Sequence, residues 1–428
     1  MKKYTEMSAD ELKDQKSALA IEYEKMKASG LKLDMSRGKP DANQLGISRG
    51  ILDAVDSKTL TVTESGIECA NYAPLDGIPE AKRLMAGLLM TEEDEVFVGG
   101  NSSLNLMHDV ITFCLMFCLP GCEKPWIKQG EVKFICPVPG YDRHFAVTEH
   151  LGFTMLPVPM KSDGPDLDAA EELVKDPSVK GMWCVPKYSN PQGITCSDGV
   201  IKRFAAMKPA ACDFRFFFDN AYAVHDLYDD KKDELIPILA EFKKQGRENN
   251  AFIFSSTSKI TFPGGGVSAI GAAKENMDFI KKHMSKMTIG YDKINQLRHA
   301  RYFKDMNGIK QHMKKHAAAM RPKFDTVINT FQSELSDTGI VSWNKPLGGY
   351  FISFDAMPGT AKRAVAMCKA AGLTITAAGA THPYGNDPED KTIRIAPSFP
   401  GVEELEKAVK LFCVAVKLAA VEKLLGNK

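Results

Sequence analysis

Two charged side chains of this sequence follow apolar, strand-like runs. Asp219 ends the aromatic run Arg215–Phe218, and Lys259 stands four residues beyond the run Ala251–Ser255. A buried carboxylate costs free energy unless a cation or a strong donor meets it, whereas burial of a lysine favours its neutral, nucleophilic amine. A helix N-cap is the alternative role for Asp219, and a solvent-facing side chain is the alternative for Lys259.

Two further polar side chains follow strand-like runs in the same way. Tyr141 lies in PVPGYDRH after the run Val132–Cys136, and Asn190 lies in SNPQG after Met182–Val185. A tyrosine on a turn can stack on a planar ligand. Asn-Pro is also a common turn signal, so an ordinary turn explains Asn190 equally well.

Ser102 and Ser103 follow Gly99 and Gly100 and open an expected helix. Free N–H groups and the helix dipole make such a position suitable for a phosphate, although ordinary capping also explains the serines. A phosphate cradle, a tyrosine, an asparagine, an aspartate and a lysine together suit one kind of ligand. That ligand is a planar phosphorylated aldehyde whose ring nitrogen pairs with a carboxylate and whose carbonyl reacts with an amine.

The elements that must position these residues are short buried strands separated by helical segments. The gaps between Cys136, Val185, Phe218 and Ser255 are 49, 33 and 37 residues, long enough for crossover helices. We therefore expect an α/β fold with a mostly parallel sheet and helices on both faces. The next run, Val267 to Ala272, follows too closely for a crossover and is expected to be an antiparallel neighbour.

The two chain ends have a different texture. Residues 3–29 read as an exposed charged helix, and residues 296–335 as one long charged helix. Strand-like runs at 350–354 and 392–395 alternate with expected helices at 360–371 and 402–424. We expect residues 1–50 to form an N-terminal arm and part of a small domain, residues 51–300 a large domain, and residues 301–428 the rest of a small α+β domain.

Composition narrows the class of protein. Among 428 residues, 55 Lys and Arg balance 54 Asp and Glu, so no overall field favours nucleic acid or anionic lipid. The ten cysteines form no C-x-x-C pair, which indicates reduced thiols and no metal site. No secretory leader or apolar span is evident, so we expect a cytoplasmic protein that does not bind membranes.

In register, these motifs resemble fold-type I pyridoxal-phosphate enzymes of the class I aminotransferase group, and within it a divergent aspartate aminotransferase. The resemblance runs from RGKPD near the start to TIRIAPSF near the end and includes YAPLDGIPE, GNSSLN, PVPGY, SNPQG, DNAY and SSTSK. It implies a seven-stranded-type sheet flanked by helices in a large domain that binds pyridoxal 5′-phosphate. It also implies a small domain built from both chain ends, and a homodimer.

The resemblance assigns roles to individual residues. Lys259 would be the Schiff-base lysine, Asp219 would pair with the pyridine nitrogen, and Tyr222 would contact the ring hydroxyl oxygen. Arg394 would bind the substrate α-carboxylate, although a structural ion pair is its alternative role. The remaining positions are those that would hold the phosphate (Ser102, Ser103, Ser256 and Tyr72 of the neighbouring subunit), the ring (Tyr141, Asn190) and the substrate (Gly38, Arg37, Asn190).

One position departs from the family pattern. The family usually has a phosphate-binding arginine seven or eight residues after the lysine, where this chain has Gly266 and Val267. The phosphate would then depend on serines, helix N–H groups and a cation from elsewhere. For the side-chain carboxylate of a dicarboxylic substrate, the candidate cations are Arg37, Lys293 and Arg298.

The resemblance favours transfer of an amino group from aspartate to 2-oxoglutarate. Aminotransferases of other specificity, for alanine or aromatic amino acids, share these residues, as do lyases and decarboxylases that use the same cofactor. A DNA-binding regulator would need a further module, for which residues 1–30 are too short. A purely structural protein would leave Asp219 and Lys259 as unexplained buried charges.

Overall fold

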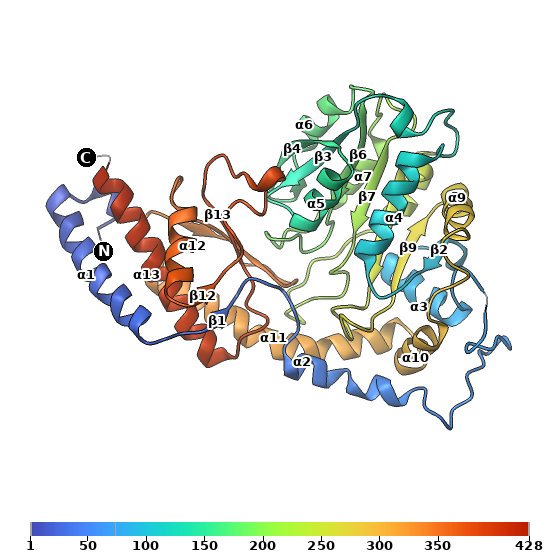
Figure 1. Cartoon of the computed structure of the whole chain (residues 1–428), viewed down its shortest axis with the longest axis horizontal. Coiled ribbons are helices and arrows are strands. Elements are labelled where there is room, and N and C mark those ends of the chain that lie inside the picture. The colour runs from blue at the N-terminus through green and yellow to red at the C-terminus, as the bar shows by residue number, and fades with distance from the viewer. Residues whose placement is uncertain (1, 73, 427–428) are drawn as a thin grey trace.

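The computed structural model describes residues 2–72 and 74–426, and it contains two sheet-based parts joined by a long helix, α11 (Met306–Leu335) (Figure 1). In the larger part, an eight-stranded sheet has the order β2-β9-β8-β7-β6-β3-β4-β5. Strands β3, β4, β6, β7 and β8 run parallel, and β9 is antiparallel to β8. The expected mostly parallel sheet and its antiparallel neighbour are confirmed.

The sheet has one strand more than expected. Strand β5 is only Gly164–Pro165, and it pairs antiparallel with the end of β4. Two residues give no periodic signal, and a proline is tolerated in a sheet only at an edge or a bulge.

Each face of the large sheet is covered by its own helices. On β7, Phe216 and Phe218 belong to the apolar cluster that includes α3, α7 and α8, whereas Phe217 belongs to the cluster that includes α4 and α9. Because side chains alternate along a strand, a continuous aromatic run can fill both layers. This explains why the three residues before Asp219 on β7 are all phenylalanine.

The smaller part combines the two ends of the chain. Strands β10, β11 and β13 form an antiparallel sheet, and β1 pairs with β12. Helices α1 and α13 lie side by side at its outer edge (Figure 1). Tyr23 Oη on α1 donates a hydrogen bond to the Met367 carbonyl on α12, at 2.9 Å. The domain limits predicted from the sequence stay a prediction.

The prediction of a single helix over residues 296–335 was wrong, because the structure has two helices there, α10 and α11. Helix α10 ends at Phe303, and Lys304 then takes the positive φ of 65°. Asp305 caps the next helix by accepting a hydrogen bond from the Gly308 amide at 2.9 Å. A Cβ on Gly308 would lie 1.9 Å from the Phe303 carbonyl oxygen, so the tight turn requires glycine.

None of the helices within the described ranges is both long enough and apolar enough to cross a membrane. The strands are β1 Leu33–Asp34, β2 Val96–Val98, β3 Lys133–Val138, β4 Thr154–Lys161, β5 Gly164–Pro165, β6 Val179–Cys184, β7 Arg215–Asp219, β8 Ala251–Ser256, β9 Ser268–Ala272, β10 Ser342–Trp343, β11 Ile352–Asp355, β12 Leu373–Thr374 and β13 Thr392–Ile395. The α-helices are α1 Ala9–Ala28, α2 Ala42–Ile47, α3 Pro79–Leu89, α4 Ser103–Met116, α5 Asp142–His150, α6 Leu167–Leu173, α7 Asp198–Ala206, α8 Ile238–Lys244, α9 Lys274–Met284, α10 Lys293–Phe303, α11 Met306–Leu335, α12 Ala361–Ala370 and α13 Val402–Gly426.

Candidate active site

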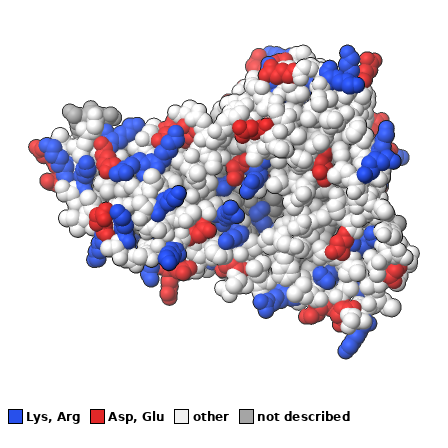
Figure 2. Space-filling view, in the orientation of Figure 1, with Lys and Arg blue, Asp and Glu red and all other residues white. Residues whose placement is uncertain are grey.

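A cavity of about 150 Å³ lies at the carboxyl ends of the parallel strands, where ligands bind in open α/β sheets. Space-filling atoms show the face of the molecule hollowed between the two parts, with Lys or Arg side chains at the hollow (Figure 2). The cavity brings together eight of the residues predicted from the sequence. Its lining consists of Ser102, Ser103, Leu104, Met107, Tyr141, Val185, Asn190, Asp219, Ala221, Tyr222, Ser256, Ser258 and Lys259.

Asp219 is buried at the end of β7, with only 3% of its surface exposed. Its Oδ2 lies 3.0 Å from His144 Nε2, and its Oδ1 has no hydrogen-bond partner among the described residues. Asp219 caps none of the α-helices described above, so the N-cap alternative does not hold. A buried carboxylate oxygen without a donor is costly, and it suits a ligand that brings an N–H group.

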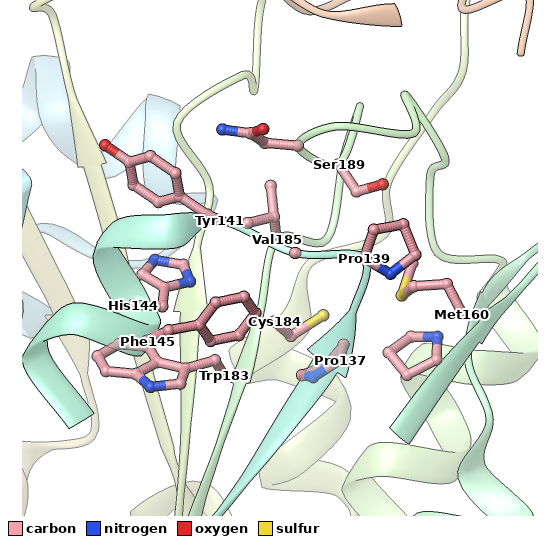
Figure 3. A pocket seen from close by; sticks show the side chains of 13 residues that line it. Pro137, Pro139, Tyr141, His144, Phe145, Met160, Trp183, Cys184, Val185 and Ser189 are labelled. Carbon is pink, nitrogen blue, oxygen red and sulfur yellow. The ribbon is translucent and has the colours of Figure 1, made fainter. Parts of the chain in front are cut away.

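His144 was not predicted from the sequence, although it fixes the carboxylate of Asp219. Its ring stacks on Trp183 with centroids 4.5 Å apart and planes 9° apart, beside a second, smaller cavity (Figure 3). Trp183 Nε1 donates to Thr148 Oγ1 at 2.8 Å, and Thr148 Oγ1 donates to the His144 carbonyl at 2.7 Å. The only signal in the sequence is the position of His144 one helical turn after Tyr141.

Lys259 follows β8, which is the neighbour of β7 in the sheet. The side chain is half-buried, and its Nζ lies 4.9 Å from the ring centroid of Tyr222. Burial lowers the pKa of Lys259, while the charge of Asp219 acts in the opposite direction. The amine is therefore more easily deprotonated than an ordinary lysine.

The loop that carries Lys259 is held by its threonines. The Thr257 amide donates to the Val267 carbonyl at 2.8 Å, and the Val267 amide donates to Thr257 Oγ1 at 2.8 Å. Thr261 Oγ1 lies 3.0 Å from Nε2 of the buried His299 on α10. These contacts fix the backbone on both sides of the lysine.

Two tyrosines of the cavity stay protonated near neutral pH. Burial raises the pKa of Tyr141 to about 12 and raises the pKa of Tyr222 well above its usual value. Tyr141 precedes α5, and its ring meets the His144 ring edge-on with centroids 5.0 Å apart. Both phenols can therefore donate hydrogen bonds to a ligand.

The serines gather at the N-terminus of α4. Ser102 stands at the N-cap position but makes no capping hydrogen bond, so ordinary capping does not explain it. Ser258, which was not predicted, also lines the cavity, and its Oγ donates to the Asn101 carbonyl at 2.7 Å. Its signal was the short serine-rich run that includes Ser256. Free N–H groups and hydroxyls here form a site suited to a phosphate.

The structure explains why one of the two positions at which the family has a phosphate-binding arginine is a glycine in this chain. A Cβ on Gly266 would lie 2.9 Å from the backbone nitrogen of Ser258, so this residue packs directly on the lysine loop. No arginine lines the cavity within residues 2–72 and 74–426. At the N-terminus of α4, the donors available to a phosphate are therefore N–H and hydroxyl groups.

Arg394 lies on β13 in the smaller part and is 7% exposed. Its Nη1 donates to Asn190 Oδ1 at 3.3 Å, and its Nε lies 3.4 Å from Thr376 Oγ1. The same Nη1 donates to Asp142 Oδ1 at 2.7 Å, a partner that was not predicted from the sequence. The guanidinium carbon stands 4.9 Å from the centroid of Phe351.

Gly38 lies against Phe351, the same ring that Arg394 contacts. A Cβ on Gly38 would lie 2.5 Å from Cζ of Phe351, the ring against which Arg394 packs. Arg37 is exposed and does not line the cavity. Gly38 thus lets the backbone pack closely against the Phe351 ring, whereas Arg37 is not among the residues that line the cavity.

The other predicted residues lie away from the cavity of their own chain. Tyr72 is 75% exposed. Lys293 is buried, with Nζ 3.4 Å from the Tyr291 carbonyl oxygen, and Arg298 is half-buried on α10. The structure therefore brings no second arginine or lysine beside Arg394 from this set.

Comparisons with known proteins point to one family. The sequence model of the family described as aspartate amino-transferase matches residues 7–428. An aspartate aminotransferase of Corynebacterium glutamicum is 45% identical over 430 residues, which cover 99% of each chain. A crystal structure of an aspartate transaminase from the same organism is 44% identical, with a TM-score of 0.96 and 99% of each chain covered. An α-aminoadipate aminotransferase of Thermus thermophilus, 18% identical and covering 93% of this chain, shares the fold with a TM-score of 0.71.

Proposed function

The chain belongs to the aspartate aminotransferase family, and we propose that it binds pyridoxal 5′-phosphate in the cavity and transfers the amino group of L-aspartate to 2-oxoglutarate. One observation carries the cofactor assignment: Asp219 Oδ1 is buried without a donor in the same cavity as the Lys259 amine. A pyridinium N–H would satisfy the first group, and an aldehyde would engage the second.

The other lining residues fit the remaining parts of this coenzyme. Ser102, Ser103 and the N-terminus of α4 would hold the phosphate, together with Ser256. Tyr141 would stack on the ring, and Asn190 and Tyr222 would donate hydrogen bonds to the ring hydroxyl oxygen. When bound, the coenzyme supplies an electron-withdrawing ring that stabilises negative charge on the substrate Cα.

The residues of this chain would then handle the proton and the charge. Asp219, oriented by His144, would keep the ring nitrogen protonated. The Lys259 amine, whose pKa is lowered, would take the proton from the substrate Cα and deliver it to C4′, the aldehyde carbon of the coenzyme. Arg394 would hold the α-carboxylate with two parallel hydrogen bonds, which a lysine could not form.

The preference for aspartate rests on the family and on the named relative, since none of Arg37, Lys293 and Arg298 is among the residues that line the cavity. We also propose a homodimer, in which Tyr72 reaches the phosphate of the neighbouring subunit. The 75% exposure of Tyr72 supports this, because a tyrosine so open in one chain is available to a partner.

The decisive test replaces Lys259. Lys259→Ala should lower kcat by about 10⁴-fold or more, because the variant lacks the group that binds the aldehyde and moves the proton. It should also lose the visible absorption band that the purified wild-type protein gains with the coenzyme. Lys202→Ala, at an exposed position on α7, is the matched control and should keep both.

Normal turnover of the Lys259→Ala protein would refute the role given to this lysine. A panel of amino donors, followed by the shift of the coenzyme band, should show the largest response with L-aspartate. A larger response to alanine or to an aromatic amino acid would overturn the proposed specificity while leaving the aminotransferase reaction in place.

A further inference from the structure

The buried Arg394 already has a carboxylate partner within its own chain. Asp142 Oδ1 accepts a hydrogen bond from Arg394 Nη1 at 2.7 Å. The two residues come from different parts of the fold, since Asp142 begins α5 and Arg394 lies on β13. Asp142 follows Tyr141, which lines the cavity, so the ion pair lies at the cavity edge.

The two members of this ion pair differ in their access to water. The Arg394 side chain is 7% exposed, whereas the Asp142 side chain is 32% exposed. A buried guanidinium that loses its carboxylate becomes an uncompensated charge, but a half-exposed aspartate can turn toward solvent at small cost. The pair is therefore built so that Asp142 is the member that leaves.

The surroundings allow Asp142 to leave and hold Arg394 in place. Arg394 keeps contacts to Asn190, to Thr376 and to the ring of Phe351 when its aspartate is exchanged. Asp142 stands in the first turn of α5, where the helix dipole stabilises a negative charge. A carboxylate brought by a ligand can thus replace Asp142 on the guanidinium without rebuilding the site.

We propose that Asp142 is a specificity-determining residue that occupies Arg394 until a substrate carboxylate displaces it. The inference rests on the proposed role of Arg394 as the α-carboxylate site. An amine without a carboxylate has nothing with which to replace Asp142, so it leaves the ion pair closed. Binding is thereby an exchange of one carboxylate for another, and the affinity for every carboxylic substrate is reduced by the strength of the internal pair.

The test measures succinate, a dicarboxylate without an amino group, binding to the coenzyme-loaded enzyme by calorimetry. Asp142→Asn keeps the size of the side chain and removes its charge, so succinate should bind about fivefold to tenfold more tightly than to the wild type. KM for the amino donor should fall while kcat changes little. Asp142→Ser is the second variant, and it should shift in the same direction.

Glu149→Gln on the same helix is the matched control, because Glu149 is exposed and lies at the other end of α5. Unchanged or weaker succinate binding by both Asp142 variants would overturn the inference, since Asp142 would then be neutral or would hold Arg394 ready for substrate. Arg394→Lys separates the two proposals. If it still binds succinate like the wild type, the role of Arg394 fails; if it loses binding while the Asp142 variants show no gain, only the role of Asp142 fails.

Discussion

At the scale of single residues, the site depends on the different surroundings of the two carboxylate oxygens of Asp219. One carboxylate oxygen faces His144, and the other is buried without a partner among the residues that the structure describes. This arrangement holds the carboxylate in one orientation and leaves Oδ1 able to accept a hydrogen bond from a ligand. A second buried aspartate, Asp213, lies two residues before β7 and pairs with Lys180 on β6 at 2.8 Å as an ordinary buried ion pair.

This contrast gives a prediction. Asp219→Asn should lower kcat by about 10²- to 10³-fold, because a neutral amide cannot keep the ring nitrogen of the coenzyme protonated. Steady-state kinetics with saturating coenzyme would measure the loss. The protein should fold normally, since the amide can still pair with His144.

Asp213→Asn is the matched control. It should lose thermal stability, because Lys180 becomes a buried charge without a carboxylate, yet keep its turnover. Equal losses of turnover in both variants would indicate that Asp219 only supports the fold.

Single residues also show which parts of the site the sequence could predict and which it could not. Asp219 and Lys259 could be placed because each follows an apolar run, and the ends of neighbouring parallel strands meet at one edge. His144 and Asp142 gave no such signal, because each acts through a contact with a residue more than 70 positions away. Such contacts depend on where the tertiary fold places α5 relative to β7 and β13, which no local pattern reports.

At the scale of elements, runs of apolar residues predicted the strands well, and helix ends were harder. The break between α10 and α11 arises from one cap, Asp305, and one glycine, Gly308. The surrounding residues have helical character throughout, so the periodic signal continued across the break. Capping turns of this kind are decided by one or two residues and are easily missed.

The tight turn at this break leads to a second prediction. Gly308→Ala should lower the free energy of unfolding by about 1–3 kcal/mol, because the added Cβ would meet the Phe303 carbonyl and force the backbone to shift. Thermal denaturation of the coenzyme-free protein would measure it.

Gly46→Ala is the control for this substitution. Gly46 lies in α2, with no atom within 4 Å of its added Cβ, so the variant should be as stable as the wild type or slightly more stable. A Gly308→Ala protein that is as stable as Gly46→Ala would show that the turn tolerates a side chain.

At the scale of the whole molecule, the proposed dimer can be tested by mixing variants. Sedimentation should give about twice the 47.1 kDa of one chain. Lys259→Ala and Tyr72→Ala proteins should each be weakly active. Exchange of their subunits should restore about a quarter of the wild-type activity, because half of the dimers then contain one site with both residues.

This result depends on the side of the interface from which Tyr72 acts. If Tyr72 served the cavity of its own chain, neither site in a mixed dimer would be complete, and no activity would return. A fully active monomer in sedimentation would contradict the dimer itself. Cytoplasmic location and the limits of the two domains stay predictions from the sequence.

The packing of α1 against α13 has a consequence for how the protein is made. Helix α1 and strand β1 are synthesised before the large sheet, whereas their partners α13 and β12 are synthesised after it. Helix α1 must therefore remain without its packing partner while the strands of the large sheet, which lie between α1 and α13 in the sequence, are synthesised. Arg394 lies on β13, which follows the whole large sheet in the chain, so the proposed carboxylate site is completed only after that sheet has been synthesised.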